Sequence, residues 1–353
     1  MEFLFNFRAF CLFSLSSRCL QVLPFLVFRL QCLSFLQDVT LHQVALSMAE
    51  NEVEHEKQNR IKAKVNIEEP SEELLEWAKN NINEDPDTRD LLISELKDMI
   101  YERGECTPSR MDDEFILGFL RARHFNLRIA HRLYVNHSIL KEEAPQYFDD
   151  VNLDRMVEIV KEPIFNVPPN RDHLGRRMLI FRIGEWRPSE FTPTELLQFV
   201  VFLTQITLLE PQTQIKGAIL LVDLSGLSLE MVWYLTPTLA RHVVNLAASS
   251  FPVRLEAVHF LYTSWIFDTA YNIFKVFIPE RFRDRIHFHN NLDTLYDDVD
   301  PKYLPNSLGG AIDDYTLEDW MNDAVLCNKK VIDVLGKAGY PLKEFLARRN
   351  NNK

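Results

Sequence analysis

The segment GAILLVDL, residues 217–224, is apolar without the alternation of a half-exposed strand. A short, uninterrupted apolar run is typical of a central strand that is covered on both faces. Two similar runs flank it in the chain, MLIFRI at 178–183 and AVHFLY at 257–262, and RIHFH at 285–289 predicts a fourth strand. Strands that alternate with helical segments indicate an α/β fold with a mostly parallel sheet.

Two segments between these strands are too apolar for surface helices. The sequence Thr192-Pro193-Thr194-Glu195 predicts a capped helix start with proline at the first helical position, and the residues up to Ile206 are apolar nearly all round. The segment 265–278 is similar. Such helices must be covered on most faces or line a cavity. A sheet of apolar strands walled by these helices therefore predicts a dry internal chamber suited to a lipid.

A cluster of arginines follows the second apolar helix. After Pro279 breaks the helical pattern, Arg281, Arg283 and Arg285 occur within five residues. A hydrophobic helix that runs into a basic cluster is typical of an element that meets an anionic bilayer. The alternative interpretation is a plain core helix followed by arginines that solvate a surface or pair with Glu280 and Asp284.

The first half of the chain predicts a helical region. Helical spacing of apolar residues begins after Pro70, Ser109 with Asp112 predicts a capped helix start, Asn126 predicts another, and Pro145 ends the region. A chain of 353 residues is long enough for about two domains of roughly 150 residues each. We therefore expect three segments after residue 69: an all-helical domain over 70–145, an α/β domain over 151–325, and a C-terminal tail with a helix over 326–353.

The N-terminal 47 residues differ in composition from the rest. Arg8, Arg18 and Arg29 interrupt the apolar runs, so no run reaches the ~18 residues that a membrane span needs. We interpret residues 1–47 as a disordered or non-native hydrophobic extension, with a polar flexible segment over 48–69. A signal peptide and an amphipathic anchor are the alternatives. The five scattered cysteines indicate neither a disulfide framework nor a zinc site.

No motif for catalysis is present in the sequence. The net charge of −12 argues against a general nucleic-acid binder. The phosphate-binding patterns and the G-x-S-x-G nucleophile motif do not occur. His287 and His289 would point to one side of a strand, but no third ligand is evident and we expect no metal. His259 is expected to be an ordinary buried histidine. We therefore predict neither an enzyme nor a cofactor other than a bound lipid.

Many ordered motifs resemble one family. The sequence over roughly 70–325 is similar to the CRAL-TRIO lipid-binding family, which includes the alpha-tocopherol transfer protein, the retinaldehyde-binding protein and the clavesins. The matching segments are FILGFLRARHFNLRIAHRLY, GRRMLIFRIGEW, FTPTELL, LVDLSG, SFPVRLEAVHFLY, IFDTAYNIFKVF, RFRDRIHFHN and LPNSLGG. This resemblance implies a three-helix N-terminal domain, then an α/β lipid-binding domain with a mostly parallel sheet and a mobile gate helix.

The resemblance also implies three groups of site residues. The lipid-binding pocket would be lined by Leu197, Val200, Val201, Thr204, Ala218, Val222, Leu235, Val243, Leu246, Ala247, Phe251, Leu255 and Val258. The gate would comprise Trp265, Ile266, Phe267, Ala270, Ile273, Phe274 and Phe277. Phosphoinositide head groups would be bound by Arg123, Arg254, Lys275, Arg281, Arg283 and Arg285.

Two departures from the family pattern bear on the ligand. Glu256 occupies a position that is basic in relatives, which affects the affinity for head groups. Val200 and Thr204 correspond to hydroxyl positions that help to hold tocopherol, and only Thr204 keeps a hydroxyl. The ligand is therefore left open as a small hydrophobic lipid of the tocopherol, retinoid or phospholipid kind.

The function implied by the resemblance is binding and transfer of such a lipid between membranes. The protein would be cytoplasmic, would dock reversibly on phosphoinositide-containing membranes, and would form no stable oligomer. The alternative is a lipid-sensing regulatory scaffold in membrane trafficking that presents a lipid, or itself, to a protein partner.

Overall fold

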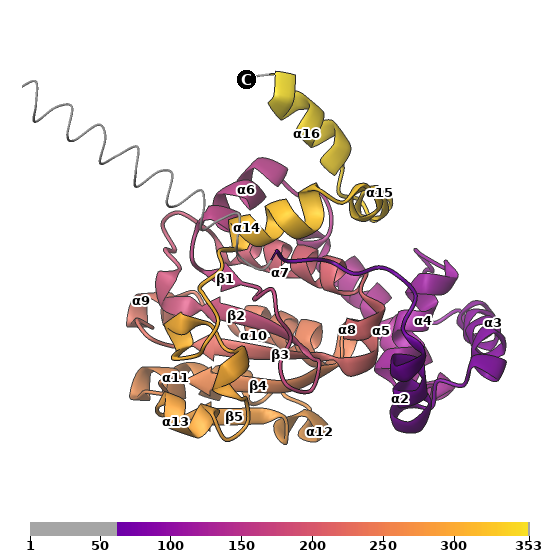
Figure 1. Cartoon of the computed structure of the whole chain (residues 1–353), viewed down its shortest axis with the longest axis horizontal. Coiled ribbons are helices and arrows are strands. Elements are labelled where there is room, and N and C mark those ends of the chain that lie inside the picture. The colour runs from indigo at the N-terminus through magenta and orange to yellow at the C-terminus, as the bar shows by residue number, and fades with distance from the viewer. Residues whose placement is uncertain (1–61, 352–353) are drawn as a thin grey trace, which may run out of the picture. The chain divides into compact units, whose positions relative to one another are not determined.

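The computed structural model describes residues 62–351, and the described residues form one compact unit. A block of helices precedes a sheet with helices on both faces, and further helices follow it (Figure 1). The expectations for residues 1–47, and for 48–61 of the polar segment, lie outside the described residues. In the described remainder of that segment, Ala63 and Val65 are buried in the main hydrophobic core.

Over the described residues 70–143, four α-helices occur where the resemblance implied three: α2 Glu72–Ile82, α3 Pro86–Arg103, α4 Asp113–Ala122 and α5 Leu127–Glu143. Asn126 caps α5, as predicted, by accepting a hydrogen bond from the Ile129 amide. The expected cap at Ser109 is wrong, because α4 begins at Asp113 and its amides are capped by Asp112. The additional helix α2 contributes Ala78 and Ile82 to a small cluster with Ile215 of α8, Pro211–Lys216.

The sheet has five strands in the order β1-β2-β3-β4-β5. The four predicted strands are confirmed as β2 Arg177–Arg182, β3 Ala218–Asp223, β4 Leu255–Leu261 and β5 Ile286–His289, all paired in parallel. The fifth strand, β1 Phe165–Asn166, pairs antiparallel with β2. It has only two residues, so it carries no periodic signal that the sequence could reveal.

The side chains on the two faces of the sheet differ in their exposure to solvent. On what we call the back face, Met178, Ile180, Ile219 and Leu221 are at most 1% exposed. On the opposite, inner face the registers place two apolar rows across three strands, Leu179-Leu220-Val258 and Phe181-Val222-Phe260. Leu179, Phe181, Leu220 and Phe260 in these rows are only half-buried, although helices pack over this face.

Helices cover both faces of the sheet. On the inner face, α7 Pro193–Thr207 and α11 Trp265–Phe274 bury Phe199, Phe202 and Phe267 in one cluster with Val222 and Val258. The capping box predicted for α7 is confirmed. Two shorter helices, α9 Leu229–Trp233 and α10 Pro237–Val244, contact α11, and a π-helical turn, η3 Asn245–Ser250, continues α10. On the back face, α13 Leu292–Leu295 and the following turns contribute Leu295, Val299, Leu304 and Leu308.

Further helices and helical turns connect or follow these elements. They are η1 Pro145–Tyr147, α6 Leu153–Lys161, η2 Ile183–Glu185, α12 Glu280–Arg283, η4 Pro301–Tyr303, η5 Asn306–Leu308, α14 Leu317–Trp320, η6 Met321–Leu326, α15 Lys329–Lys337 and α16 Leu342–Asn351. Within the described residues, no helix combines the length and the hydrophobicity required to span a bilayer.

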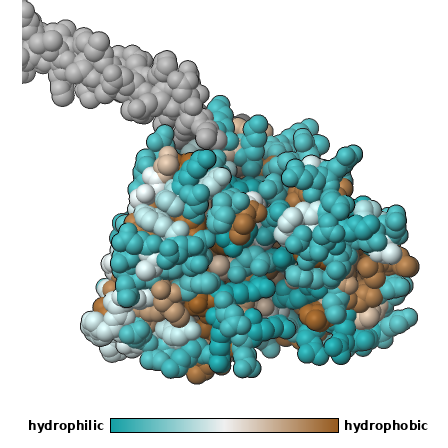
Figure 2. Space-filling view, turned by 60° about the horizontal axis from the view of Figure 1, so that its bottom comes forward, coloured by the Kyte–Doolittle hydropathy of each residue, from teal (hydrophilic) through white to brown (hydrophobic). Residues whose placement is uncertain are grey.

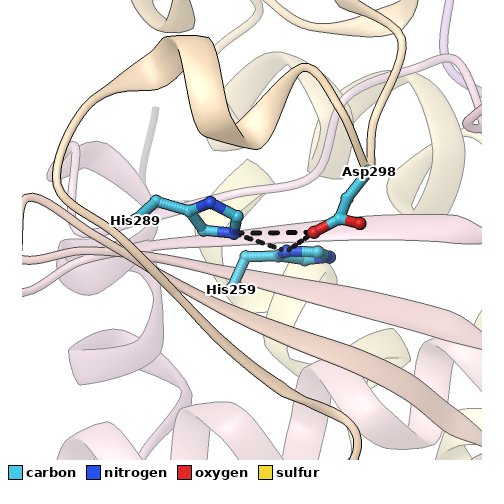
Figure 3. Close-up of side chains that lie close together, drawn as sticks. All are labelled: His259, His289 and Asp298. Atoms are coloured by element: carbon cyan, nitrogen blue, oxygen red, sulfur yellow. Dashed lines mark hydrogen bonds and ion pairs between the residues drawn. The ribbon is translucent and has the colours of Figure 1, made fainter.

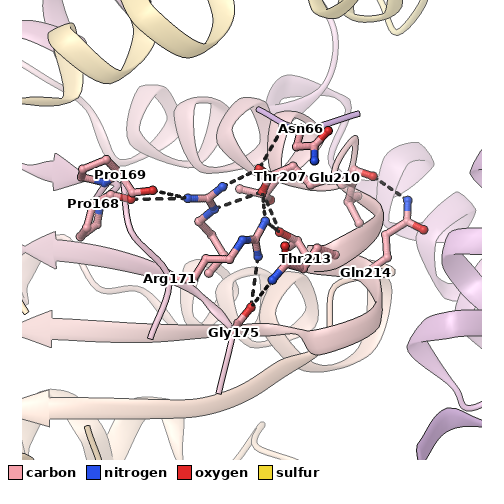
Figure 4. A network of polar contacts seen from close by, with 12 residues as sticks. Asn66, Pro168, Pro169, Arg171, Gly175, Thr207, Glu210, Thr213 and Gln214 are labelled. Atoms are coloured by element: carbon pink, nitrogen blue, oxygen red, sulfur yellow. Dashed lines mark hydrogen bonds and ion pairs between the residues drawn. The ribbon is translucent and has the colours of Figure 1, made fainter. Parts of the chain in front are cut away.

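A buried ion-pair network supports the amino-terminal edge of the sheet (Figure 4). The carboxylate of Glu210, which follows α7, forms ion pairs with Arg177 of β2 and with Arg171, at 2.9 Å for the latter. The Thr213 hydroxyl donates to the same carboxylate at 2.7 Å. Burial raises the pKa of Glu210, but Arg177 and Arg171 outweigh this effect, so its pKa lies below the ordinary value. The network therefore holds Glu210 as a buried carboxylate.

Candidate functional site

Four arginines from distant parts of the chain converge on one site. Arg123 follows α4, Arg254 precedes β4, Arg281 lies in α12, and Arg285 precedes β5. Burial, together with the charges of Arg281, Arg285 and Arg254, lowers the pKa of Arg123 to about 10. The other three guanidinium groups therefore lie within electrostatic range of Arg123. We call these four residues the arginine cluster.

Backbone carbonyl groups hold the arginine cluster in place. Arg123 donates to the carbonyl oxygens of Ala122 and Ala248, at 2.9 and 3.3 Å, and Arg285 donates to that of Leu255 at 2.6 Å. The buried Arg254 donates to the carbonyl oxygen of Ile215. Carbonyl acceptors orient these side chains without cancelling their charge. Such a preorganised group of cations suits a multiply charged anion.

Glu256 neutralises part of the cluster. Its carboxylate lies 2.9 Å from the guanidinium of Arg254. Burial lowers the pKa of Arg254, and the charge of Glu256 opposes that effect. The described residues give no ion pair between the cluster and Glu280 or Asp284, the acidic partners considered in the alternative interpretation. Lys275 and Arg283 are exposed, and neither contributes to the pKa shift of Arg123 or Arg254. The geometry therefore groups four of the six expected basic residues.

The expected gate is shorter than its apolar sequence. Helix α11 begins at Trp265, where the Ser264 side chain caps it, and ends at Phe274, so Phe277 lies in the turn that leads to α12. Phe267 and Ala270 are buried, and Ile266, Ile273 and Phe274 are half-buried. Trp265 at the start of the helix is 66% exposed. The helix thus presents apolar surface both to the sheet and to solvent.

Aromatic contacts hold α11 on the sheet. The ring of Phe267 lies 5.0 Å from that of Phe260 in β4 and 5.8 Å from that of Phe288 in β5, and the ring of Tyr271 lies 5.2 Å from that of Phe288. Offset and edge contacts of this kind contribute about 0.5–1.5 kcal/mol each beyond burial. These contacts add to the burial of Phe267 and Ala270 in fixing α11 against the sheet.

The expected pocket residues fall into two groups. Ala218, Val222, Leu255 and Val258 come from β3 and β4, and Val200 and Ala247 pack against the core cluster that contains Val222, Leu255 and Val258. A second group packs away from the sheet, in a cluster with Leu140 and Tyr147 of the helical region: Leu197, Val201, Val243, Leu246 and Phe251. Leu235 is half-buried just after α9, and the Thr204 hydroxyl donates to the Val200 carbonyl oxygen at 2.7 Å.

The inner face keeps accessible apolar surface under its helices. Leu220 stands at the middle of the central strand but is only half-buried, and Val200, Thr204 and Ala247 on the covering helices are also half-buried. Their neighbours on the back face, Ile219 and Leu221, are fully buried. Such side chains keep apolar surface that a bound molecule could cover. The half-buried residues of the inner face are therefore the candidate contacts of a lipid.

The structure contains a groove that none of the expected pocket residues lines. It is a hydrophobic groove of about 350 Å³ between α6, α7, η6 and α16, lined by Leu153, Met156, Val157, Val160, Phe202, Glu318, Met321, Asn322, Leu326, Leu342, Phe345 and Leu346. A further surface depression is lined by Glu230, Trp233 and Tyr234.

Sequence reasoning missed an exposed apolar group beside the gate. Helix α9 contacts α11, and its Trp233 is 85% exposed, with Leu229 and Tyr234 also exposed. Together with Trp265 we call these residues the apolar rim. The face drawn in Figure 2 is largely hydrophilic and is interrupted by separate hydrophobic patches. The only signal in the sequence was an aromatic pair after the helix cap at Ser228, which is too local to predict exposure.

Comparisons with known proteins identify relatives. A family model described as the CRAL/TRIO domain matches residues 161–310. Clavesin-1 of Pongo abelii is 32% identical over 253 residues, which cover 71% of this chain and 72% of the relative. Clavesin-2 of Homo sapiens is 30% identical over 253 residues, covering 71% of this chain and 77% of the relative. The crystal structure of Sfh5 aligns with a TM-score of 0.47 at 14% identity, covering 72% of this chain and 97% of that one.

Proposed function

The chain belongs to the CRAL-TRIO lipid-binding family, and from that membership we propose that it holds a small hydrophobic lipid and transfers it between membranes. The lipid would lie on the inner face of the sheet, under α7 and α11. The half-buried apolar side chains of that face support this position, because burial of their remaining surface by a ligand is favourable.

The observation that carries the proposal is the convergence of the arginine cluster next to the gate. Arg281 and Arg285 directly follow the gate segment in the chain, and Arg123 and Arg254 lie within electrostatic range of them. The phosphates of a phosphoinositide are multiply charged anions of the kind that grouped arginines bind. Docking through this cluster would bring the gate helix and the apolar rim to the bilayer.

The energetics favour exchange of the lipid over irreversible capture. Burial of a lipid of ~20 carbons removes on the order of 16 kcal/mol of hydrophobic cost, at ~0.8 kcal/mol per methylene. A bilayer offers the same lipid a similar gain. Transfer is then nearly balanced, and the protein acts mainly by removing the aqueous barrier. Displacement of α11 from Phe260 and Phe288 would open the inner face for this exchange.

The proposal is tested by vesicle binding and lipid transfer. The double variant Arg281→Ala/Arg285→Ala is compared with Arg132→Ala/Arg348→Ala, which removes the same charge from exposed positions outside the cluster. Each cation near an anionic surface contributes about 1 kcal/mol, so the cluster variant, which lacks two, is expected to bind phosphoinositide vesicles roughly 30-fold more weakly and to transfer lipid more slowly. Added salt should reduce this difference.

Two outcomes would change the assignment. Equal sedimentation of both double variants with phosphoinositide vesicles would remove the arginine cluster from the docking site. A wild-type protein that carries a lipid, as detected by native mass spectrometry, but exchanges none between vesicles would favour the regulatory scaffold. Phosphoinositide-dependent exchange would support transfer.

A further inference from the structure

Histidines gather on the back face of the sheet, opposite the gate helix. The register pairs His259 of β4 with His287 of β5, and Leu261 with His289, so the three imidazoles project from the same face. Asp298, in the segment after α13, reaches the same point (Figure 3). Phe260 and Phe288, which alternate with these histidines along the strands, contact the gate helix instead. The histidine group is therefore separate from the proposed lipid site.

Three potential ligand atoms form a compact triangle. His259 Nδ1 lies 3.0 Å from His289 Nε2, and Asp298 Oδ2 lies 3.8 Å from the first atom and 3.9 Å from the second. Zinc–ligand bonds to nitrogen and oxygen are about 2.0–2.2 Å long, so ligand atoms in a tetrahedral site stand about 3.3 Å apart. The triangle needs only small side-chain adjustments to match one face of that tetrahedron.

Hydrogen bonding of Thr294 favours one tautomer of His289. The Thr294 hydroxyl donates to the carbonyl oxygen of Asn291 at 3.1 Å, so at His289 Nδ1, also 3.1 Å away, it acts as the acceptor. His289 then carries its proton on Nδ1 and directs the lone pair of Nε2 toward His259 and Asp298. A ligating histidine that donates its other N–H to an oxygen is the usual arrangement around protein-bound metals.

Only one of the triangle's three contacts, the 3.0 Å contact between His259 Nδ1 and His289 Nε2, is within hydrogen-bond distance. The two distances to Asp298 Oδ2, 3.8 and 3.9 Å, exceed those of hydrogen bonds. His259 is 1% exposed and His289 4% exposed, and Nε2 of His259 is buried without a hydrogen-bond partner among the described residues. Burial of polar atoms without partners is costly. Nε2 of His259 lies across the ring from Nδ1 and outside the triangle, so a cation at the centre would instead bind Asp298 Oδ2 and replace the hydrogen bond between the two histidines.

From this geometry we propose that His259, His289 and Asp298 form a binding site for a divalent transition-metal ion, with zinc as the preferred ion. His287 Nδ1, 3.5 Å from Asp298 Oδ2, or a water molecule on the exposed side of Asp298 completes the tetrahedron. Imidazole with a carboxylate suits zinc, whereas calcium and magnesium prefer ligand sets made of oxygen. The ion would link β4 to β5 and to the segment after α13.

The site has a mechanical role in the fold. β5 pairs only with β4 among the described strands, so the histidines are the back-face anchors of a short edge strand. Phe288 on the other side of that strand supports the gate helix. A metal ion at His259 and His289 would stiffen the support on which α11 rests.

The experiment measures zinc binding to the full chain, purified without a polyhistidine tag and stripped with a chelator. Calorimetry and metal analysis of the wild type are expected to give about one tightly bound zinc per chain, with a rise in Tm. His289→Ala and Asp298→Asn are each expected to weaken this binding by about tenfold or more. His173→Ala, at an exposed histidine, should bind zinc as the wild type does.

Asp298→Asn tests the proposal even if His289→Ala fails to fold. The Asp298 side chain is 40% exposed, so the fold is expected to tolerate this substitution. If folded Asp298→Asn binds zinc with unchanged affinity, or if the folded wild type binds none, the triangle is a hydrogen-bonded structural group and the proposal is overturned. Cobalt substituted at the site should give the visible absorption of a tetrahedral centre, and loss of that absorption in Asp298→Asn would support the assignment. Neither readout depends on lipid transfer.

Discussion

At the scale of single residues, Glu256 sets the charge of the arginine cluster. Its carboxylate pairs with the buried Arg254, the cluster member with the least access to solvent. The acidic residue therefore reduces the local positive charge while it stabilises an arginine that burial disfavours. The departure of Glu256 from the family pattern was evident from the sequence. Its pairing with Arg254 was not, although the two residues flank Leu255 and share one side of β4, because the sequence does not show that Arg254 is buried.

Glu256→Gln is expected to strengthen binding to phosphoinositide vesicles. Removal of one negative charge from the cluster has the same electrostatic effect as one additional cation. This change favours membrane binding by about 1 kcal/mol, or roughly fivefold in affinity. Vesicle sedimentation at low and moderate salt measures the change, with Glu344→Gln on the exposed surface of α16 as the charge-matched control. Equal affinities of the two variants would show that Glu256 does not face the bound membrane.

A second residue-scale effect concerns His137 of α5. Its Nδ1 lies 3.0 Å from the carbonyl oxygen of Ser250, to which it donates, and the rings of Phe119 and Phe251 pack against it at 5.7 and 5.0 Å. Burial lowers the pKa of His137 to about 4. The imidazole is therefore neutral in the folded protein at physiological pH.

The depressed pKa predicts a specific loss of stability in acid. The unfolded chain binds a proton at His137 near pH 6.5, while the folded protein resists it down to about pH 4. The stability of the wild type should therefore decline between these values by about 3 kcal/mol from this group alone. His137→Phe should show a shallower decline in urea unfolding, whereas His173→Phe should keep the wild-type slope. Parallel slopes for all three proteins would contradict the assignment.

At the scale of elements, strong local patterns were sufficient for the strands and for two helix starts. GAILLVDL and the capping box at Thr192 specify their elements because burial on both faces and N-terminal capping are local requirements. The position of the cap at Asp112, and the exposure of Trp233 on α9, depend on packing that only the folded chain provides. The two-residue strand β1 is formed by pairing with β2 rather than by its own sequence.

The packing of the expected pocket residues also could not be predicted from the sequence. Because α7 is apolar nearly all round, its sequence does not reveal which stripe faces the sheet. In the structure Val200 packs with the sheet cluster, whereas Leu197 and Val201 pack with Tyr147 and Leu140 of the helical region. The half-buried row that includes Leu220 became apparent only from the registers of β2, β3 and β4.

Leu220→Trp is expected to reduce the amount of bound lipid. A larger side chain at the half-buried centre of the inner face would occupy the space proposed for the lipid. In a tightly packed core, the same substitution would lower the free energy of unfolding by about 1–3 kcal/mol through overpacking. Native mass spectrometry measures the co-purified lipid and thermal unfolding measures stability, with Leu174→Trp at an exposed position as the control. A strongly destabilised Leu220→Trp would indicate that no hollow exists there.

At the scale of the whole described unit, the Glu210 network joins segments that are distant in the chain. Arg177 belongs to β2, Arg171 to the preceding loop, and Thr213 to α8, while the amide of Asn66 donates to Glu210 at 3.4 Å. A sequence shows charged residues but not their burial, so this network could not be predicted. It fixes the edge of the sheet from which β2 and β3 begin.

Removal of the Glu210 carboxylate should destabilise the protein and change its response to acid. Loss of one partner from a buried ion pair costs about 3–5 kcal/mol, so Glu210→Gln should lower Tm markedly at neutral pH. The lowered pKa of Glu210 means that its contribution is present above the unfolded value of about 4.5 and is lost as the pH falls through the folded pKa. The difference in stability between the wild type and Glu210→Gln should therefore become smaller below pH 4.5.

The control variant is Glu158→Gln, whose partner Arg155 is at the surface. It should lose much less stability, since exposed ion pairs contribute about 0–1 kcal/mol. A stability difference between the wild type and Glu210→Gln that stays constant with pH would show that Glu210 acts through its shape and hydrogen bonds rather than through its charge.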